Sequence, residues 1–155
     1  MLSKSKREFH RKTAVLCFNE TWDYLEKRGR TEQDDQRMLQ LAHASRYHWG
    51  LVGTPRNMAV GDWQISRVYA ALKQPHLSLL YAKSSLGICR KEKLSELLAT
   101  AYEGVARGYA VAEDFASARR CLRLARKQLE TLDLRAEDRK VYLGQINETE
   151  KLIAR

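Results

Sequence analysis

Apolar side chains recur at helical spacing along almost the whole of this 155-residue chain, and this periodicity constrains the fold more than any other feature. Spacings of three and four residues place such side chains on one face of an α-helix, whereas a half-buried strand would alternate apolar and polar residues. No segment shows that alternation. The first predicted helix runs from Lys6 to Arg28, and its expected buried side consists of Phe9, Val15, Phe18, Trp22 and Leu25. We therefore expect an all-α protein.

Turn signals divide the chain into about seven predicted helices. Gly29 ends the first, and Thr31 with Asp34 three residues later predicts a capping box that opens the second. The stretch GLVGTPRN, residues 50–57, separates the second helix from the third, because two glycines end one helix and a Thr-Pro pair can begin the next. The later predicted helices cover 75–90, 95–112, 114–131 and 136–155. Such short turns predict antiparallel hairpins.

Length and composition indicate one globular domain over residues 1–155. The chain is 44% hydrophobic and 30% charged, and it has only two prolines and eight glycines. No apolar run is long enough to span a bilayer and no signal-peptide core follows the basic N-terminus, so we expect a cytoplasmic protein that does not bind membranes. Three cysteines without CxxC spacing indicate free thiols. Phosphate-loop, dinucleotide and HExxH motifs are absent, and we expect no cofactor and no metal site.

A weak internal repeat links the middle of the chain to its last third. Aligning SRVYA with ARGYA pairs Arg67 with Arg107 and Tyr69 with Tyr109, so both pairs share one offset along the chain. The second copy, residues 101–127, resembles a tetratricopeptide-repeat helix pair. Its matching positions are Tyr102, Val105, Ala106, Tyr109, Phe115, Ala118, Leu122 and Ala125. The first copy, from Asp62 onward, matches less well.

This resemblance implies a right-handed stack of antiparallel helical hairpins. The charged last helix is expected to cap the stack and face solvent. The segments HASRYHWG, GDWQISRVYA and YEGVARGYA also resemble a family of small bacterial proteins to which no function is assigned. That second resemblance supports the fold and implies no activity.

The tetratricopeptide resemblance also implies a concave groove lined by the first helix of each pair. Its groove positions correspond to Trp63, Arg67, Glu103 and Arg107. Two stacked arginines can hold a carboxylate or phosphate with forked donors, and Trp63 offers a stacking surface. In the alternative reading, Glu103 and Arg107 form an ordinary ion pair within one helix while Arg67 packs over Trp63.

The nonapeptide AHASRYHWG, residues 42–50, concentrates histidine and aromatic residues in one helix. We expect His43 and Arg46 to reach the rim of the groove, and His48 and Trp49 to pack against the third helix. The two histidines are about 140° apart around the helix axis, so they cannot chelate one metal ion as an i, i+4 pair does. No strained turn exposes Ser45 as a nucleophile. The segment is therefore interpreted as structural, and no catalytic residue is predicted.

These observations predict a non-enzymatic binding or adaptor module. A net charge of +9 favours acidic partners, and we expect the groove to hold an acidic or C-terminal peptide of a partner protein. The alternatives are a small-molecule pocket or enzyme around His43, Arg46, Trp63 and Arg67, and nucleic-acid binding through basic patches. The second alternative lacks a known nucleic-acid-binding signature and would use Arg119, Arg123 and Arg126. Homodimerisation through an apolar end of the stack also stays open.

Overall fold

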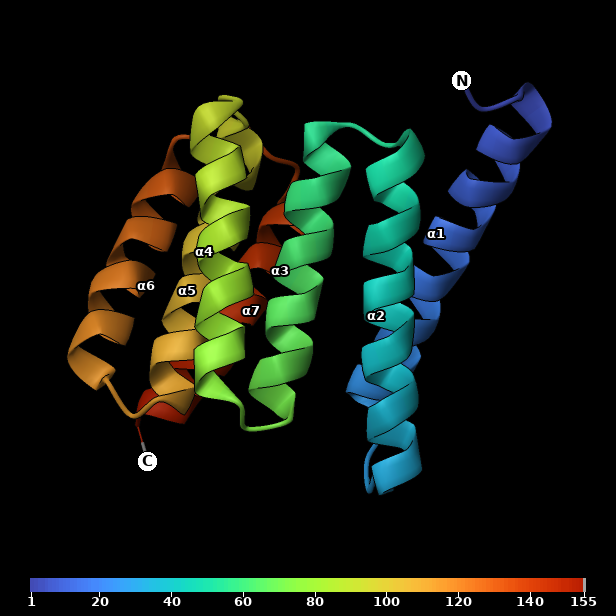
Figure 1. Cartoon of the computed structure of the whole chain (residues 1–155). Helices are drawn as coiled ribbons and strands as arrows, with labels where there is room; N and C mark the ends of the chain where they lie inside the picture. Colours follow the sequence, from blue (N-terminus) through green and yellow to red (C-terminus); the bar gives the residue numbers. More distant parts are fainter. Residues whose placement is uncertain (155) are drawn as a thin grey trace.

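The computed structural model describes residues 1–154, in which the chain forms seven α-helices, one short 3₁₀ helix and no strand. The helices are α1 (Lys4–Glu26), α2 (Glu32–Val52), α3 (Pro55–Ala71), α4 (Pro75–Lys91), α5 (Leu98–Val111), α6 (Phe115–Glu130) and α7 (Ala136–Ile153), with the 3₁₀ helix at Ser95–Leu97. Three antiparallel hairpins, α1–α2, α3–α4 and α5–α6, stand side by side, and α7 follows the last (Figure 1). The expected all-α hairpin stack is confirmed, and the helix ends lie close to the predicted ones.

Local signals in the sequence account for the first turn. Thr31 accepts a hydrogen bond from the Asp34 backbone and Asp34 accepts one from the Thr31 backbone, so the predicted capping box is present. Gly29 adopts φ = 65°, a left-handed conformation that side chains disfavour. The first hairpin therefore turns where the sequence predicts it.

The hairpins α3–α4 and α5–α6 follow one geometric repeat. The helix ends Ala71 and Val111 are separated by the same offset as Arg67 and Arg107, and so are the helix starts Pro75 and Phe115. Three successive turns also share one geometry, in which the amide after a left-handed residue bonds a carbonyl five residues back. The left-handed residues are Lys73, Lys93 and Glu113, with φ of 55°, 55° and 61°. The offset seen in the sequence thus extends through both hairpins and their connections.

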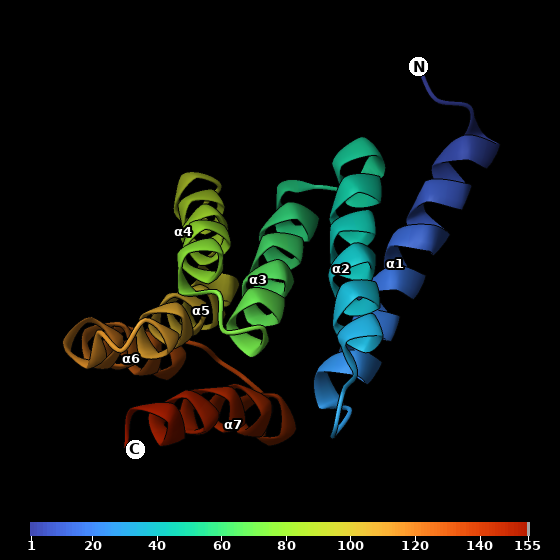
Figure 2. The same cartoon turned by 60° about the horizontal axis from the view of Figure 1, so that its bottom comes forward.

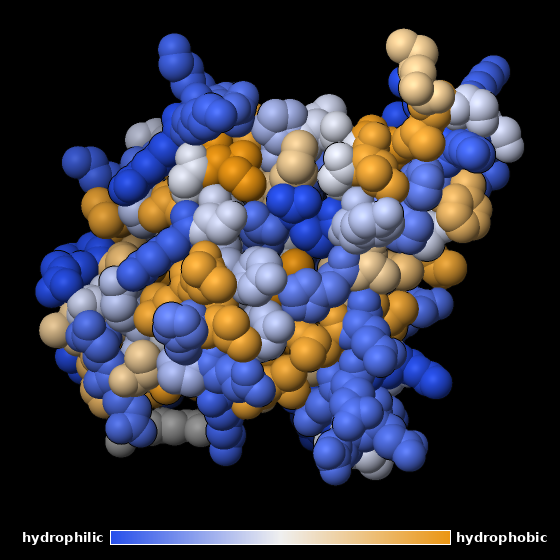
Figure 3. All heavy atoms as spheres, in the orientation of Figure 1, coloured by the Kyte–Doolittle hydropathy of each residue, from blue (hydrophilic) through white to orange (hydrophobic). Residues whose placement is uncertain are grey.

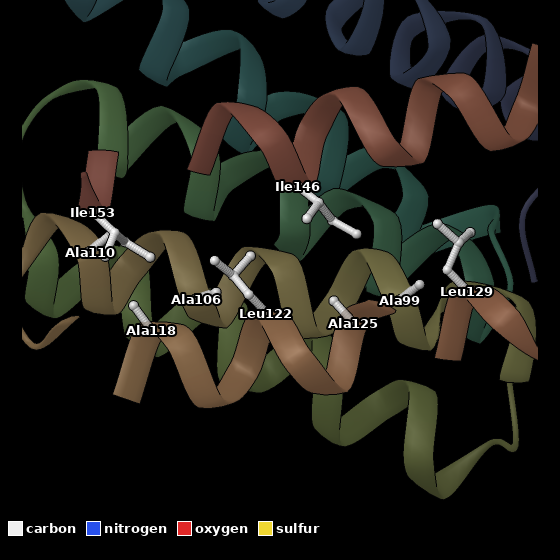
Figure 4. Packing of buried hydrophobic residues seen from close by; sticks show 9 residues of the cluster. All are labelled: Ala99, Ala106, Ala110, Ala118, Leu122, Ala125, Leu129, Ile146 and Ile153. Carbon is white, nitrogen blue, oxygen red and sulfur yellow. The ribbon is translucent and has the colours of Figure 1, made fainter. Parts of the chain in front are cut away.

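Small side chains let the helices of each hairpin approach closely. Ala106 and Ala118 are both fully buried between α5 and α6, among larger apolar residues of α5, α6 and α7 (Figure 4). The corresponding residues of the preceding hairpin are Ser66 and Ser78, and the Ser78 hydroxyl donates to the Ser66 carbonyl at 3.0 Å. Close packing at both crossings follows from the size of these residues.

Glycine lets neighbouring hairpins approach each other. A Cβ atom at Gly108 of α5 would lie 2.9 Å from the Leu79 side chain of α4, and one at Gly104 would lie 2.9 Å from Trp63 of α3. Larger residues at these two positions would force the second and third hairpins apart.

The expected buried side of α1 is wrong in part. Phe9 and Val15 are exposed, and the residues of α1 that are buried are Ala14, Cys17 and Thr21. The Ser45 hydroxyl of α2 donates to the Ala14 carbonyl at 2.8 Å, which requires close contact between the two helices. α1 carries bulky apolar residues on more than one side, and the pairing with α2 uses the side with small residues.

The last helix packs on the third hairpin and also runs along the side of the stack where the groove is predicted. Ile146 and Ile153 are buried against α5 and α6. Figure 2 shows α7 crossing beside α5 and α6 with its N-terminal end directed toward the first hairpins. The expected cap is therefore present, but α7 is not only a solvated helix, because it reaches the predicted groove. No helix in residues 1–154 has the length and apolar character needed to cross a membrane.

Candidate functional site

The structure brings together the four residues predicted to line the groove, but only Arg67 and Arg107 reach the hollow described below, because Trp63 and Glu103 are buried. Trp63 and Arg67 lie on α3, and Glu103 and Arg107 lie on α5. The Glu103 carboxylate accepts a hydrogen bond from Arg107 Nε at 2.9 Å and a long one from Trp63 Nε1 at 3.4 Å. Arg67 Nη1 is 3.8 Å from the same carboxylate. Glu103 is thus the centre of the cluster.

Glu103 is only 1% exposed, and α7 completes its set of partners. Thr149 Oγ1 donates to Glu103 Oε1 at 2.6 Å. A buried carboxylate is tolerated when it is both paired and hydrogen-bonded, and here two arginines, a tryptophan and a threonine provide these interactions. The cluster therefore links three helices, α3, α5 and α7.

Arg67 packs against two neighbouring tryptophan rings, whose centroids are 5.6 Å apart. Its guanidinium carbon is 5.2 Å from the ring centroid of Trp22, on α1, and 5.4 Å from that of Trp63. Burial, followed by the positive charge of Arg107, lowers the pKa of Arg67, while the neighbouring glutamates oppose this shift. Contact with both rings restricts the orientations open to the guanidinium group.

A second carboxylate, supplied by α7, bridges the two arginines. Glu148 Oε2 is 3.2 Å from Arg67 Nη2 and 3.3 Å from Arg107 Nη2. The Glu148 side chain is 58% exposed, unlike that of Glu103. The outer carboxylate can therefore be exchanged without opening the core, whereas the inner one cannot.

A hollow of about 1350 Å³ opens beside this bridge. Arg67, Arg107 and Glu148 form one side of it, and Lys73 and Lys140 add positive charge. Its other lining residues are Trp22, Leu25, Glu26, Ala70, Ala71, Val111, Ala110, Glu113, Phe115, Val141, Gly144, Gln145 and Leu152. The hollow combines apolar surface with side chains of both charges and is open to solvent.

Sequence reasoning missed three members of this cluster: Trp22, Glu148 and Thr149. Trp22 belongs to the predicted apolar side of α1, but no spacing connects it with Arg67. Glu148 lies 81 residues from Arg67 in the chain. Only the position of α7 reveals the last two.

His43 and Arg46 do not reach the groove rim, so that expectation is wrong. His43 Nε2 lies 3.1 Å from the Tyr69 hydroxyl oxygen, and burial lowers the pKa of His43. Arg46 Nε donates to Asp62 Oδ1 at 2.6 Å. Asp62 and Tyr69 are two helical turns apart on α3 and share a face that α2 covers, while Trp63 and Arg67 follow another face. The proposed pocket around His43, Arg46, Trp63 and Arg67 is not formed.

His48 and Ser45 of the nonapeptide also make structural contacts. His48 packs against α1, where its Nδ1 lies 2.7 Å from Nδ1 of His10, and not against α3 as expected. The Ser45 hydroxyl is committed to the Ala14 carbonyl. Residues 1–154 contain no cluster of three or more histidine, cysteine or acidic side chains that could hold a metal ion.

Of the three α6 arginines that could contact a nucleic acid, not all are available to a ligand. Arg119 and Arg123 are exposed, whereas Arg126 donates to Glu150 Oε1 at 2.8 Å and to Asn147 Oδ1 at 3.2 Å. One of the three charges that a nucleic acid would contact is therefore paired within the protein.

The chain was also compared with known proteins. No protein family, no curated protein and no solved structure matches it significantly. Any function has to be inferred from the side chains of the protein itself.

Proposed function

We propose that this protein is a non-enzymatic binding module that holds an acidic segment of a partner protein in the hollow between α1, α3, α5 and α7. One observation carries the proposal: a carboxylate, that of Glu148, already bridges Arg67 and Arg107 at the edge of the hollow. Guanidinium groups with fixed orientation favour carboxylates. A side-chain or C-terminal carboxylate of a partner would replace Glu148 or bind beside it.

The arginines are held in place before any ligand arrives. Glu103 anchors Arg107, and Arg67 packs against the rings of Trp22 and Trp63. Because both side chains are already ordered, a ligand would lose little affinity to ordering them. The Glu103–Arg107 pair and the contact of Arg67 with Trp63 are also those of the alternative interpretation, in which the arginines are structural, so a binding experiment has to separate the two.

The remaining surface of the hollow indicates what should surround the acid. Lys73 and Lys140 favour negative charge on the ligand and Glu26 and Glu113 oppose it, so Arg67 and Arg107 carry the preference for an acid. Leu25, Val111 and Val141 favour apolar side chains. A volume of about 1350 Å³ accommodates a peptide segment better than a small metabolite. We therefore favour an acidic peptide with apolar residues, bound to a tetratricopeptide-like groove in the reducing cytoplasm, where the three thiols stay free.

An array of decapeptides with Asp or Glu beside apolar residues, each paired with its Asn or Gln counterpart, tests the proposal. We expect the protein to bind acidic members at least tenfold more tightly than their amide counterparts. Lys73→Glu with Lys140→Glu should remove that preference, because the basic rim is reversed. The matched control, Lys91→Glu with Lys127→Glu, changes exposed lysines elsewhere and should retain it. Equal binding of acid and amide peptides, or an unaffected rim variant, would exclude the groove.

The nucleic-acid alternative makes a different prediction. Phosphate contacts release counterions, so binding to duplex DNA or RNA would weaken steeply with salt. Submicromolar binding at physiological salt that is lost on neutralising Arg119 and Arg123 would replace our proposal.

A further inference from the structure

Exposed apolar side chains are concentrated on the first hairpin, away from the groove cluster. Of the nine large apolar residues that are exposed in residues 1–154, six belong to residues 1–52: Met1, Phe9, Val15, Leu16, Tyr47 and Leu51. Figure 3 shows apolar surface around the N-terminal end of α1 and the C-terminal end of α2. Exposed apolar side chains gathered in one region are typical of an interaction site.

Three rings form a continuous band across the seam between α1 and α2. The ring centroids of Phe9 and His48 are 6.1 Å apart, and those of Tyr47 and His48 are 5.4 Å apart. Phe9 is 61% exposed and Tyr47 is 64% exposed, so both rings remain available to a partner. Leu16, at 57% exposure, lies two helical turns after Phe9 on the same face of α1.

The seam continues past these residues as a shallow groove. A hollow of about 670 Å³ lies between α1 and α2, and its lining includes Glu20, Asp23, Tyr24 and Ala44. Glu20 is one turn beyond Leu16, and Ala44 is one turn before Tyr47. From Phe9 to Tyr24 the seam is roughly 22 Å long, about four turns of a docked helix. Its dimensions fit the binding of one amphipathic helix.

The two ends of the seam differ in charge. Residues 4–12 contain five basic side chains, Lys4, Lys6, Arg7, Arg11 and Lys12, with Glu8 as the one acid. Within residues 1–154, Lys12 is the only one of the five in an ion pair. Two acids, Glu20 and Asp23, and one basic residue, Arg37, line the other end. In a homodimer, the five basic residues of one copy would face only two acids of the other copy. The net charge of +9 on each copy also opposes self-association.

We infer that the α1–α2 seam binds an amphipathic helix of a partner protein. The apolar stripe of the partner helix covers Phe9, Leu16 and Tyr47, and the acidic end of that helix lies beside residues 4–12. This surface is separate from the hollow at Arg67 and Arg107, and the inference does not depend on the function proposed there.

Two designed 18-residue helical peptides with the same leucine stripe serve as probes. One carries glutamates in its first two turns, and its twin carries lysines there. Fluorescence anisotropy should show at least tenfold tighter binding of the acidic peptide. Phe9→Ser with Leu16→Ser should abolish that binding, because both exposed side chains are contact residues. Leu80→Ser with Leu124→Ser, which changes two exposed leucines of α4 and α6, is the matched control and should bind normally. Circular dichroism checks that both variants remain folded.

A second variant separates charge from fold. Lys4→Gln, Lys6→Gln and Arg11→Gln should remove the preference for the acidic peptide while preserving helicity. Lys140→Glu, at the other hollow, should leave the binding unchanged. The inference is overturned if the two peptides bind equally or if the Phe9 and Leu16 variant binds as well as the parent. It is also overturned if these residues instead mediate sedimentation with phosphatidylcholine–phosphatidylserine vesicles or concentration-dependent dimerisation in analytical ultracentrifugation.

Discussion

The hairpins α3–α4 and α5–α6 share one backbone repeat, with equivalent helix ends at a constant offset, but they differ in chemistry at their crossings. In the first, the hydroxyls of Ser78 and Ser85 donate to carbonyls of α3 at 3.0 and 2.8 Å. In the second, the equivalent residues are Ala118 and Ala125, both fully buried. The crossing therefore requires small size and accepts either a methyl group or a hydroxyl. The tetratricopeptide resemblance is weaker in the first hairpin, where Pro75, Ser78 and Ala82 stand in place of Phe115, Ala118 and Leu122.

The two hairpins also differ on the groove side. Trp63 and Glu103 occupy equivalent positions, and they contact each other across the stack. One hairpin thus supplies an aromatic surface and the other a buried charge. Repeated backbone geometry with unlike side chains builds the cluster that holds the arginines.

The largest expected effect comes from changing the charged member of this pair. Glu103→Gln leaves two largely buried arginines facing Glu148 alone, so we expect the free energy of unfolding to fall by about 3 kcal/mol. Trp63→Phe keeps most of the buried ring and should lower it by only about 1 kcal/mol. Urea denaturation of both variants measures the difference. If both variants lose the same free energy of unfolding, the charge of Glu103 contributes no more to stability than the ring of Trp63.

Overpacking the crossings tests whether size alone matters there. Ala118→Leu and Ser78→Leu should each destabilise the protein by about 1 to 3 kcal/mol, because neither crossing has space for a larger side chain. Ser78→Ala makes the first crossing like the second and should reduce stability by only about 1 kcal/mol, the value of a typical hydrogen bond. Thermal unfolding measures all three. A tolerated leucine at either position would contradict the close packing described above.

The smallest expected effect concerns the turns that the hairpins share. Lys73 and Glu113 adopt left-handed backbone conformations that favour glycine. Lys73→Gly and Glu113→Gly should each raise the free energy of unfolding by about 0.5 kcal/mol, after the entropy gained by the unfolded chain is subtracted. Lys127→Gly, inside α6, is the control and should lower it by about 1 kcal/mol. If both glycine variants destabilise the protein, the turns do not follow one geometry in solution.

Much of the candidate site was predictable because it repeats. The constant offset between the two copies pairs Arg67 with Arg107, and the i, i+4 spacing adds Trp63 and Glu103 to the same faces. Whether these residues bind a ligand stays a prediction. The placement of His43 and Arg46 was not predictable, since a helix with apolar and polar residues on several sides does not indicate which side meets α3.

By itself, the sequence determined the helices, their approximate ends and the repeat, because periodicity, capping residues and glycines act within a few neighbouring residues. The tertiary structure decided which side of α1 is buried, that His48 meets His10, and that α7 brings Glu148 and Thr149 to the arginines. Those contacts join residues 38 to 81 positions apart. These long-range contacts depend on how whole helices pack against one another. A helix with several possible contact faces buries one of them only when the neighbouring helices pack against it.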